Sequence, residues 1–154
     1  MIKRWLRVEL LAGIVFAINV VGRLVVRIGS IEDADGQRLV ALLAFLAIGV
    51  AMAVAAVLWT RQRAVSDVAT DLAGGGFAGG LLCLLLGPFV GGSTPAADGL
   101  EVFLAQAGLY AAYAGGGAGF GILLVIALGK DYVSQSLAQF AEKKLSKPRR
   151  PVRG

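Results

Sequence analysis

Three polar side chains lie on one stripe of the first apolar segment: Asn19, Arg23 and Arg27, each four residues after the last. In a helix this spacing places all three on one face. An arginine inside a bilayer costs about 3 kcal/mol on insertion scales and several times more in simulations, so such residues mark a partner or a site. The stripe therefore predicts a buried polar network or a site that binds an anion.

The expected partners of Arg23 lie in the last apolar segment. Gln106, Tyr110 and Tyr113 share one helix face there, and no aspartate or glutamate falls within another expected span. We expect a polar patch of Asn19, Arg23, Gln106, Tyr110 and Tyr113 in the outer half of a helical bundle. Three interpretations stay open. Arg23 extends outward to the interface while the tyrosines pack, or the patch is a structural network that includes an acid of another subunit, or it binds an anion or lipid headgroup.

Two side chains that often serve catalysis and metal binding are missing or scarce in the chain. It has no histidine and one cysteine, Cys83, inside an apolar run. Histidine acid–base catalysis, Cys/His metal sites and an intramolecular disulfide are therefore excluded. The spans hold neither paired aspartates nor acidic metal ligands, so we expect no enzyme and no cofactor. Residues 74–79 match G-x-G-x-x-G, but no strand precedes them, and we interpret the match as fortuitous.

The elements that carry these residues are predicted membrane spans. The chain has 154 residues, 57% of them hydrophobic and 16% charged, with a mean hydropathy of +0.76. Soluble domains are about 45–50% apolar and about 25% charged, so a soluble globule, a disordered chain and a free nucleic-acid-binding domain are excluded. We predict a multi-pass protein of the cell's inner or plasma membrane. The Ala/Gly/Val/Leu/Arg bias is typical of a GC-rich bacterial genome.

Four spans follow from the apolar blocks, because a hydrocarbon core of about 30 Å needs about 20 helical residues. The expected spans are residues 8–29, 39–60, 72–92 and 104–129. The first span includes Arg23 and Arg27. Its basic start also resembles a secretory signal peptide, but no small-x-small cleavage site follows, so we expect this helix to be retained. Pro88 predicts a kink or early end in the third span, and Ser66 or Asp67 is expected to cap its helix.

Basic residues predict the orientation. Three precede the first span, two lie between the second and third, and seven follow the fourth, which is twelve of the 15 in the chain. By the positive-inside rule both termini lie in the cytoplasm. The predicted fold is therefore all-α: a polytopic integral membrane protein with a four-transmembrane-helix bundle within residues 1–145 and no soluble domain.

The residues after the fourth span are amphipathic and then basic. Residues 131–145 predict an amphipathic helix, and residues 146–154 a basic cytoplasmic tail. We expect anionic membrane lipid on the cytoplasmic side to bind here, at about 1 kcal/mol per basic residue. An acidic protein is an alternative partner; we expect no nucleic acid, because no aromatic interleaving supports base recognition. The expected lipid contacts are Lys143, Lys144, Lys147, Arg149, Arg150 and Arg153.

Two glycine-rich stretches predict close helix packing. Many of the 22 glycines recur at small-xxx-small spacing in the third and fourth spans, a glycine-zipper pattern that lets helix backbones approach in lipid. We expect the two stretches to pack against each other; an oligomer interface and a glycine-lined passage for a solute are the alternatives. The residues concerned are Gly75, Gly76, Gly79, Gly80, Gly115, Gly117, Gly119 and Gly121.

Three functions are compatible with this sequence. The favoured one is a non-catalytic accessory or scaffold subunit of a larger membrane complex, because of the glycine faces and the unpartnered Arg23. The second is a small oligomeric transporter or channel for an anionic solute, which would use the polar patch. The third is a factor that acts on membranes through its amphipathic basic tail. A membrane-protein partner or a homo-oligomer is expected.

Overall fold

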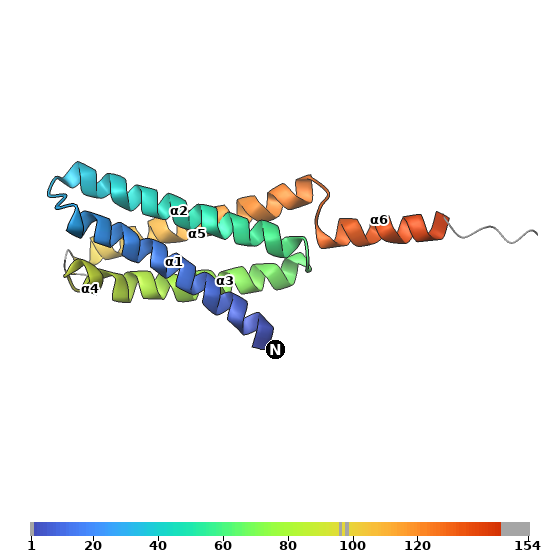
Figure 1. Cartoon of the computed structure of the whole chain (residues 1–154), viewed down its shortest axis with the longest axis horizontal. Coiled ribbons are helices and arrows are strands. Elements are labelled where there is room, and N and C mark those ends of the chain that lie inside the picture. The colour runs from blue at the N-terminus through green and yellow to red at the C-terminus, as the bar shows by residue number, and fades with distance from the viewer. Residues whose placement is uncertain (1, 96, 98, 146–154) are drawn as a thin grey trace, which may run out of the picture.

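The computed structural model describes residues 2–95, 97 and 99–145, with side chains for 5–95, 97 and 99–144. Every regular element in these ranges is helical, which confirms the predicted all-α class. The elements are α1 (Ile2–Ile28), α2 (Ala34–Thr60), α3 (Val65–Leu81), the π-helical turn η1 (Leu82–Leu86), α4 (Gly87–Gly91), α5 (Leu100–Ala127) and α6 (Tyr132–Leu145). Figure 1 shows the long helices α1, α2, α3 and α5 side by side, with α6 extending beyond them.

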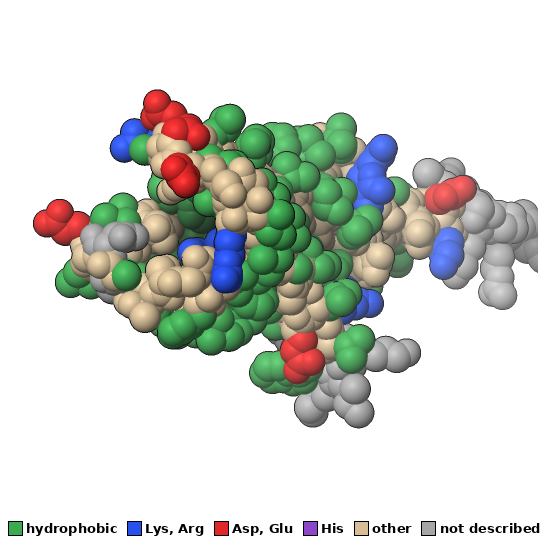
Figure 2. Space-filling view, turned by 60° about the vertical axis from the view of Figure 1, so that its left-hand side comes forward, with side chains coloured by type: hydrophobic (Ala, Val, Ile, Leu, Met, Phe, Trp, Pro, Cys, Tyr) green, Lys and Arg blue, Asp and Glu red, His purple; other side chains and the backbone are tan. Residues whose placement is uncertain are grey.

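Four helices are long and apolar enough to cross a membrane, which matches the number of spans predicted from the sequence. They cover Trp5–Ile28, Ala34–Thr60, Val65–Gly91 and Leu100–Lys144, the last including α6. Hydrophobic side chains cover the middle of the face in Figure 2, and most charged side chains lie toward the two ends. Exposed apolar surface of this extent marks contact with lipid or protein rather than water, and it suggests a multi-pass membrane protein.

The two ends of the bundle differ in their connections. The end that we call distal holds residues 29–33, between α1 and α2, and residues 92–95, 97 and 99, between α4 and α5. The opposite end, called proximal, holds the start of α1, the short turn between α2 and α3, and the link to α6 (Figure 1). The predicted orientation would put the proximal end in the cytoplasm.

Two helices begin earlier than predicted at the distal end. The Asp33 carboxylate accepts a hydrogen bond from the Gly36 N–H at 2.6 Å, and this cap lets α2 begin at Ala34 rather than at residue 39. The fourth span begins at Leu100 rather than 104, directly after Gly99, whose φ of 98° favours glycine. Short polar segments that resemble loops in sequence therefore form the first turns of these helices.

The third long helix begins at Val65, seven residues before the start of the predicted span. Its N-cap residue is Ala64, with no side-chain cap. The predicted capping by Ser66 or Asp67 is therefore wrong, because both residues already lie in the first turn. The earlier start places Asp71 inside the helix.

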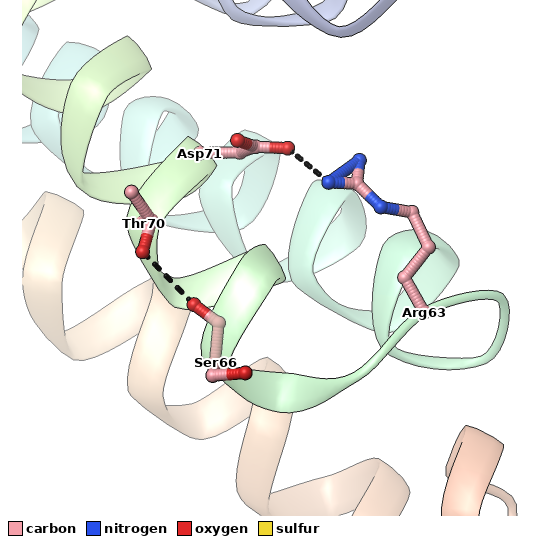
Figure 3. A network of polar contacts seen from close by, with 4 residues as sticks. All are labelled: Arg63, Ser66, Thr70 and Asp71. Atoms are coloured by element: carbon pink, nitrogen blue, oxygen red, sulfur yellow. Dashed lines mark hydrogen bonds and ion pairs between the residues drawn. The ribbon is translucent and has the colours of Figure 1, made fainter.

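Asp71 forms a buried ion pair that closes the turn between α2 and α3. Its carboxylate oxygen Oδ2 lies 2.5 Å from Nη2 of Arg63, and its side chain is 2% exposed. Figure 3 shows Arg63 reaching back from the turn, while the Thr70 hydroxyl donates to the Ser66 carbonyl at 2.9 Å on the same helix. The attraction of the Arg63 guanidinium offsets part of the cost of burying the Asp71 carboxylate.

Pro88 follows a π-helical turn instead of ending the helix. Proline has no N–H to donate to the carbonyl four residues earlier, and a local π turn is one way in which a helix accommodates that loss. The distortion is η1, immediately before α4, and the rod continues to Gly91. It ends at Gly92, whose φ of 84° is left-handed.

The long helices pack in the order α3, α1, α2, α5. Contacts are extensive between α2 and α5, between α1 and α3, and between α1 and α2, but sparse between α3 and α5. The buried core between them is apolar and includes Leu11, Val15, Ile48, Met52 and Val68. The two outer helices of this row therefore leave one side of the bundle open.

The glycine stretch of α3 packs on α1. A Cβ added to Gly75 would lie 2.9 Å from Leu11 Cδ2, and one added to Gly79 would lie 3.0 Å from Val15 Cγ1. Both glycines are buried. They bring the two helices close enough for direct backbone and side-chain packing.

The glycine stretch of α5 packs on a different helix, α2. A Cβ added to Gly117 or Gly121 would collide with the backbone carbonyl of Gly49 or Ala53, respectively. The expectation that the two stretches pack on each other is therefore corrected. A helix face made of glycines can pack closely on any helix face that carries small residues, and α2 has Gly49 and Ala53 on such a face.

Candidate functional site

A lateral groove separates α3 from α5 on the open side of the bundle. It has a volume of about 460 Å³ and reaches down to Met52 of α2. Small side chains from both helices dominate its walls. They are Ala69, Ala73, Gly76 and Gly80 of α3, and Ala107, Ala111, Ala114, Gly115 and Ala118 of α5. Sequence reasoning missed this groove, although the spacing of the small residues in α3 is the signal that could have found it.

Tyr110 links the two walls of the lateral groove. Its hydroxyl donates a hydrogen bond to the Gly76 carbonyl at 2.5 Å, and its side chain is buried. A Cβ added to Gly80 would lie 2.6 Å from Tyr110 Cε1, so that glycine makes room for the ring. The predicted membership of Tyr110 in the Arg23 patch is wrong, because a helix carbonyl of α3 already satisfies its hydroxyl.

Part of the α5 glycine stretch has no neighbour within the bundle. A Cβ added to Gly115, Gly116 or Gly119 would meet no described atom within 4 Å. Gly115 faces the lateral groove and Gly116 does not line it. Glycine in a helix costs about 0.5–1 kcal/mol relative to alanine, and in lipid small residues concentrate where helices meet. The open face of Gly115, which lies in the lateral groove, is consistent with a surface that a second helix covers.

A second cavity, the distal cavity, opens between the distal ends of α1 and α2. Its volume is about 630 Å³, and Figure 2 shows it as a hollow with basic side chains inside and acidic side chains near its rim. Its polar lining includes Asn19, Arg23, Arg27, Gln37, Arg38 and Gln106. Three of the five predicted patch residues therefore lie around one cavity.

Arg23 is held in place by its neighbour on α1. Its Nε donates to Asn19 Oδ1 at 3.0 Å, as the spacing of four residues predicted. Both side chains pack on Gly87, where an added Cβ would lie 2.6 Å from Asn19 Oδ1 and 2.9 Å from Arg23 Nε. The absence of a side chain at Gly87 thus makes room for the pair beside α4.

Neither Arg23 nor Arg27 is neutralised within the part of the chain that the structure describes. Arg27 donates from Nη1 to the Val90 carbonyl at 3.1 Å, which ties α1 to α4. The ion pairs seen among the described residues involve other arginines. The distal cavity therefore has two cationic groups without a carboxylate partner.

Tyr113 lies away from the arginines. Its ring stacks on Phe45, with centroids 6.1 Å apart and planes inclined by 16°. The predicted place of Tyr113 in the polar patch is therefore also corrected, because this face of α5 packs on α2. Tyr113 fixes the contact between α2 and α5 instead.

The segment α6 projects from the proximal end. Asp131 caps its first turn, accepting a hydrogen bond from the Ser134 N–H at 3.2 Å. Val133, Leu137 and Phe140 are exposed. The predicted lipid contacts Lys143 and Lys144 lie in its last turn; the other four, Lys147, Arg149, Arg150 and Arg153, lie outside the described residues.

Comparison with protein-family models, with curated proteins and with solved structures finds no match to this chain. Among the described residues, no group of three or more His, Cys, Asp or Glu side chains is placed to hold a metal ion. Function is therefore inferred from the geometry of the lateral groove and the distal cavity.

Proposed function

We propose that this chain is an accessory or scaffold subunit that receives a transmembrane helix of a partner protein in the lateral groove. The lateral groove itself is the observation that carries the proposal. Elsewhere the exposed sides of the helices carry large apolar residues such as Leu43, Leu46 and Leu123, each more than half exposed. The groove has large residues too, such as Phe77 and Leu81, but it also offers small residues on both walls, and these are the surface that helix association in lipid uses.

The length of the lateral groove fits a helix. Its lining runs from Ala69 on α3 to Leu84 in η1, and from Ala107 to Ile122 on α5, which is about 22 Å along each rod at 1.5 Å per residue. That length accommodates about four turns of a partner helix. Because the walls are small, the partner backbone can approach closely and gain dispersion contacts.

We infer that the protein lies in the inner or plasma membrane with both termini in the cytoplasm. The support for this orientation is the excess of basic residues at the proximal end and in the segments adjoining it. In that orientation the distal cavity opens outward, and the lateral groove lies within the hydrocarbon layer.

Filling the lateral groove tests the proposal. Gly115→Leu places a large side chain in the groove, and Gly116→Leu places the same side chain on the same helix outside it; neither position has a described atom within 4 Å of an added Cβ. We expect the wild-type chain, purified gently from its own membrane, to carry a stoichiometric partner. Gly115→Leu should reduce that association about tenfold or more, because overpacking costs about 1–3 kcal/mol, whereas Gly116→Leu should retain it. Equal retention by both variants would overturn the proposal.

The distal cavity favours a second candidate function, transport of an anionic solute by an oligomer. Below Asn19 the described core of one copy is closed by the buried residues Val15, Ile48 and Cys83, so a passage would have to form between copies. In liposomes, the purified chain alone should then move a labelled anion, and Arg23→Leu should abolish the flux. No flux above that of empty liposomes would exclude this candidate.

A further inference from the structure

We infer that the distal cavity binds a phosphate group, held by Arg23 and Arg27 and presented by an anionic phospholipid or by the free ion. The inference depends on α1 and its neighbours at the distal end, and it does not require a partner in the lateral groove. The two proposals can therefore fail separately.

The donors are already oriented. A guanidinium has five N–H donors, and Arg23 commits Nε to Asn19 at 3.0 Å while Arg27 commits Nη1 to the Val90 carbonyl at 3.1 Å. The Nη atoms of Arg23 make no hydrogen bond to a described residue. Two parallel N–H groups of an arginine match two oxygens of a phosphate, which a carboxamide or a lysine cannot reproduce.

The charge of the lining favours an anion. Three arginines and one acid, Glu32, line the distal cavity. Of the arginines, Arg38 lies at the exposed rim, 3.8 Å from Asp35. Glu32 forms no ion pair with Arg23 or Arg27 among the described residues. A half-buried, unneutralised arginine is costly in a low-dielectric layer, and a bound anion would lower that cost.

The size and depth of the distal cavity fit a headgroup. Its volume of about 630 Å³ lies within the range of about 300–1,000 Å³ that is usual for ligand sites. Arg23 precedes the last residue of α1, Ile28, by five positions, which is about 7.5 Å along the helix. Apolar residues such as Val26, Ala44 and Phe45 line the cavity beside the arginines. A ligand with a phosphate and an apolar part can therefore contact both kinds of surface.

The test measures binding of two phosphate probes to the purified full chain in neutral detergent. Phosphatidylglycerol is titrated by native mass spectrometry, with diacylglycerol as the phosphate-free lipid control, and inorganic phosphate is followed by ³¹P NMR. The variants are Arg23→Gln and Arg27→Gln. The matched control is Arg61→Gln, which removes an exposed charge at the proximal end. If Arg23→Gln does not fold, Arg27→Gln carries the test, because Arg27 is exposed.

We expect the dissociation constant of one probe to rise about tenfold or more in each distal variant, since a hydrogen bond to a charged group is worth about one order of magnitude in affinity. Arg61→Gln should bind as the wild type does. A lower dissociation constant for phosphatidylglycerol than for inorganic phosphate identifies the lipid as the source, and the reverse order identifies the free ion. The inference is overturned if neither probe binds, if diacylglycerol binds as well as phosphatidylglycerol, or if the distal variants match Arg61→Gln.

Discussion

The contact between α2 and α5 depends on a glycine that cannot be enlarged. At Gly117 an added Cβ would collide with the backbone of Gly49, whereas at the adjacent Gly116 it would meet nothing within 4 Å. Gly117→Ala and Gly116→Ala therefore add the same methyl group to neighbouring positions of one helix. Only the first of these substitutions should push the two helices apart.

The magnitude follows from two opposing contributions. Alanine stabilises a helix by about 0.5–1 kcal/mol relative to glycine, and this gain applies at both positions. Overpacking at a tight contact costs about 1–3 kcal/mol, and it applies only to Gly117→Ala because the colliding atoms are backbone. The two variants should therefore differ in their free energy of unfolding by about 1–3 kcal/mol, with Gly116→Ala the more stable.

The difference can be measured by reversible unfolding in mixed micelles, with an energy-transfer pair on α2 and α5 as the reporter. The wild type should lie between the two variants or close to Gly116→Ala. Equal free energies of unfolding for Gly116→Ala and Gly117→Ala would refute the close packing of α2 on α5. A destabilised Gly116→Ala would show that the outer face of α5 is already covered by another surface.

Three further predictions concern single side chains and the projecting helix. Tyr110→Phe should lower the free energy of unfolding by about 1 kcal/mol, because one buried hydrogen bond is lost. Tyr113→Phe should change it little, because the ring stacking remains. Equal effects of the two substitutions would contradict the hydrogen bond across the groove. Asp71→Ala should lower the free energy of unfolding by about 3 kcal/mol, because it breaks a buried ion pair. In the same unfolding assay, substitution of the exposed Asp67 by alanine should lower it by at most about 1 kcal/mol. Removal of residues 132–154 should leave the thermal midpoint of the bundle in neutral detergent within about 2 °C, because α6 has at most a weak contact with the other helices; a large drop would show that α6 packs on the bundle.

Apolar blocks of the sequence predict the number of spans well, because the length that crosses a hydrocarbon layer leaves few alternatives. They predict the ends of the helices less well. Asp33 and Asp71 are charged residues that lie outside the predicted spans, yet one caps a helix and the other is neutralised inside one. The hydrogen bond from Gly36 to Asp33 and the ion pair of Asp71 with Arg63 offset the cost of these charges. Both depend on the three-dimensional path of a turn, which composition does not reveal.

The choice of neighbours could not be predicted from the glycines alone. Gly79 and Gly121 have the same sequence signature, but the first packs on α1 and the second on α2. Helix faces in lipid are selected by shape over several turns rather than by hydrophobicity. The pairing of Asn19 with Arg23 was predictable, because it depends only on a spacing of four residues within one helix.

The central claim, that the lateral groove holds a helix of a partner, is tested most directly by photocrosslinking in the native membrane. Phe77 lines the groove and is 71% exposed, and Phe120 is 64% exposed and does not line it, so at either position the larger benzophenone analogue of phenylalanine extends from a ring that is already mostly exposed. We predict one discrete protein adduct from position 77, lost when Gly115→Leu fills the groove, and no such adduct from position 120. Adducts with lipid alone at position 77, or the same protein adduct from both positions, would contradict the claim.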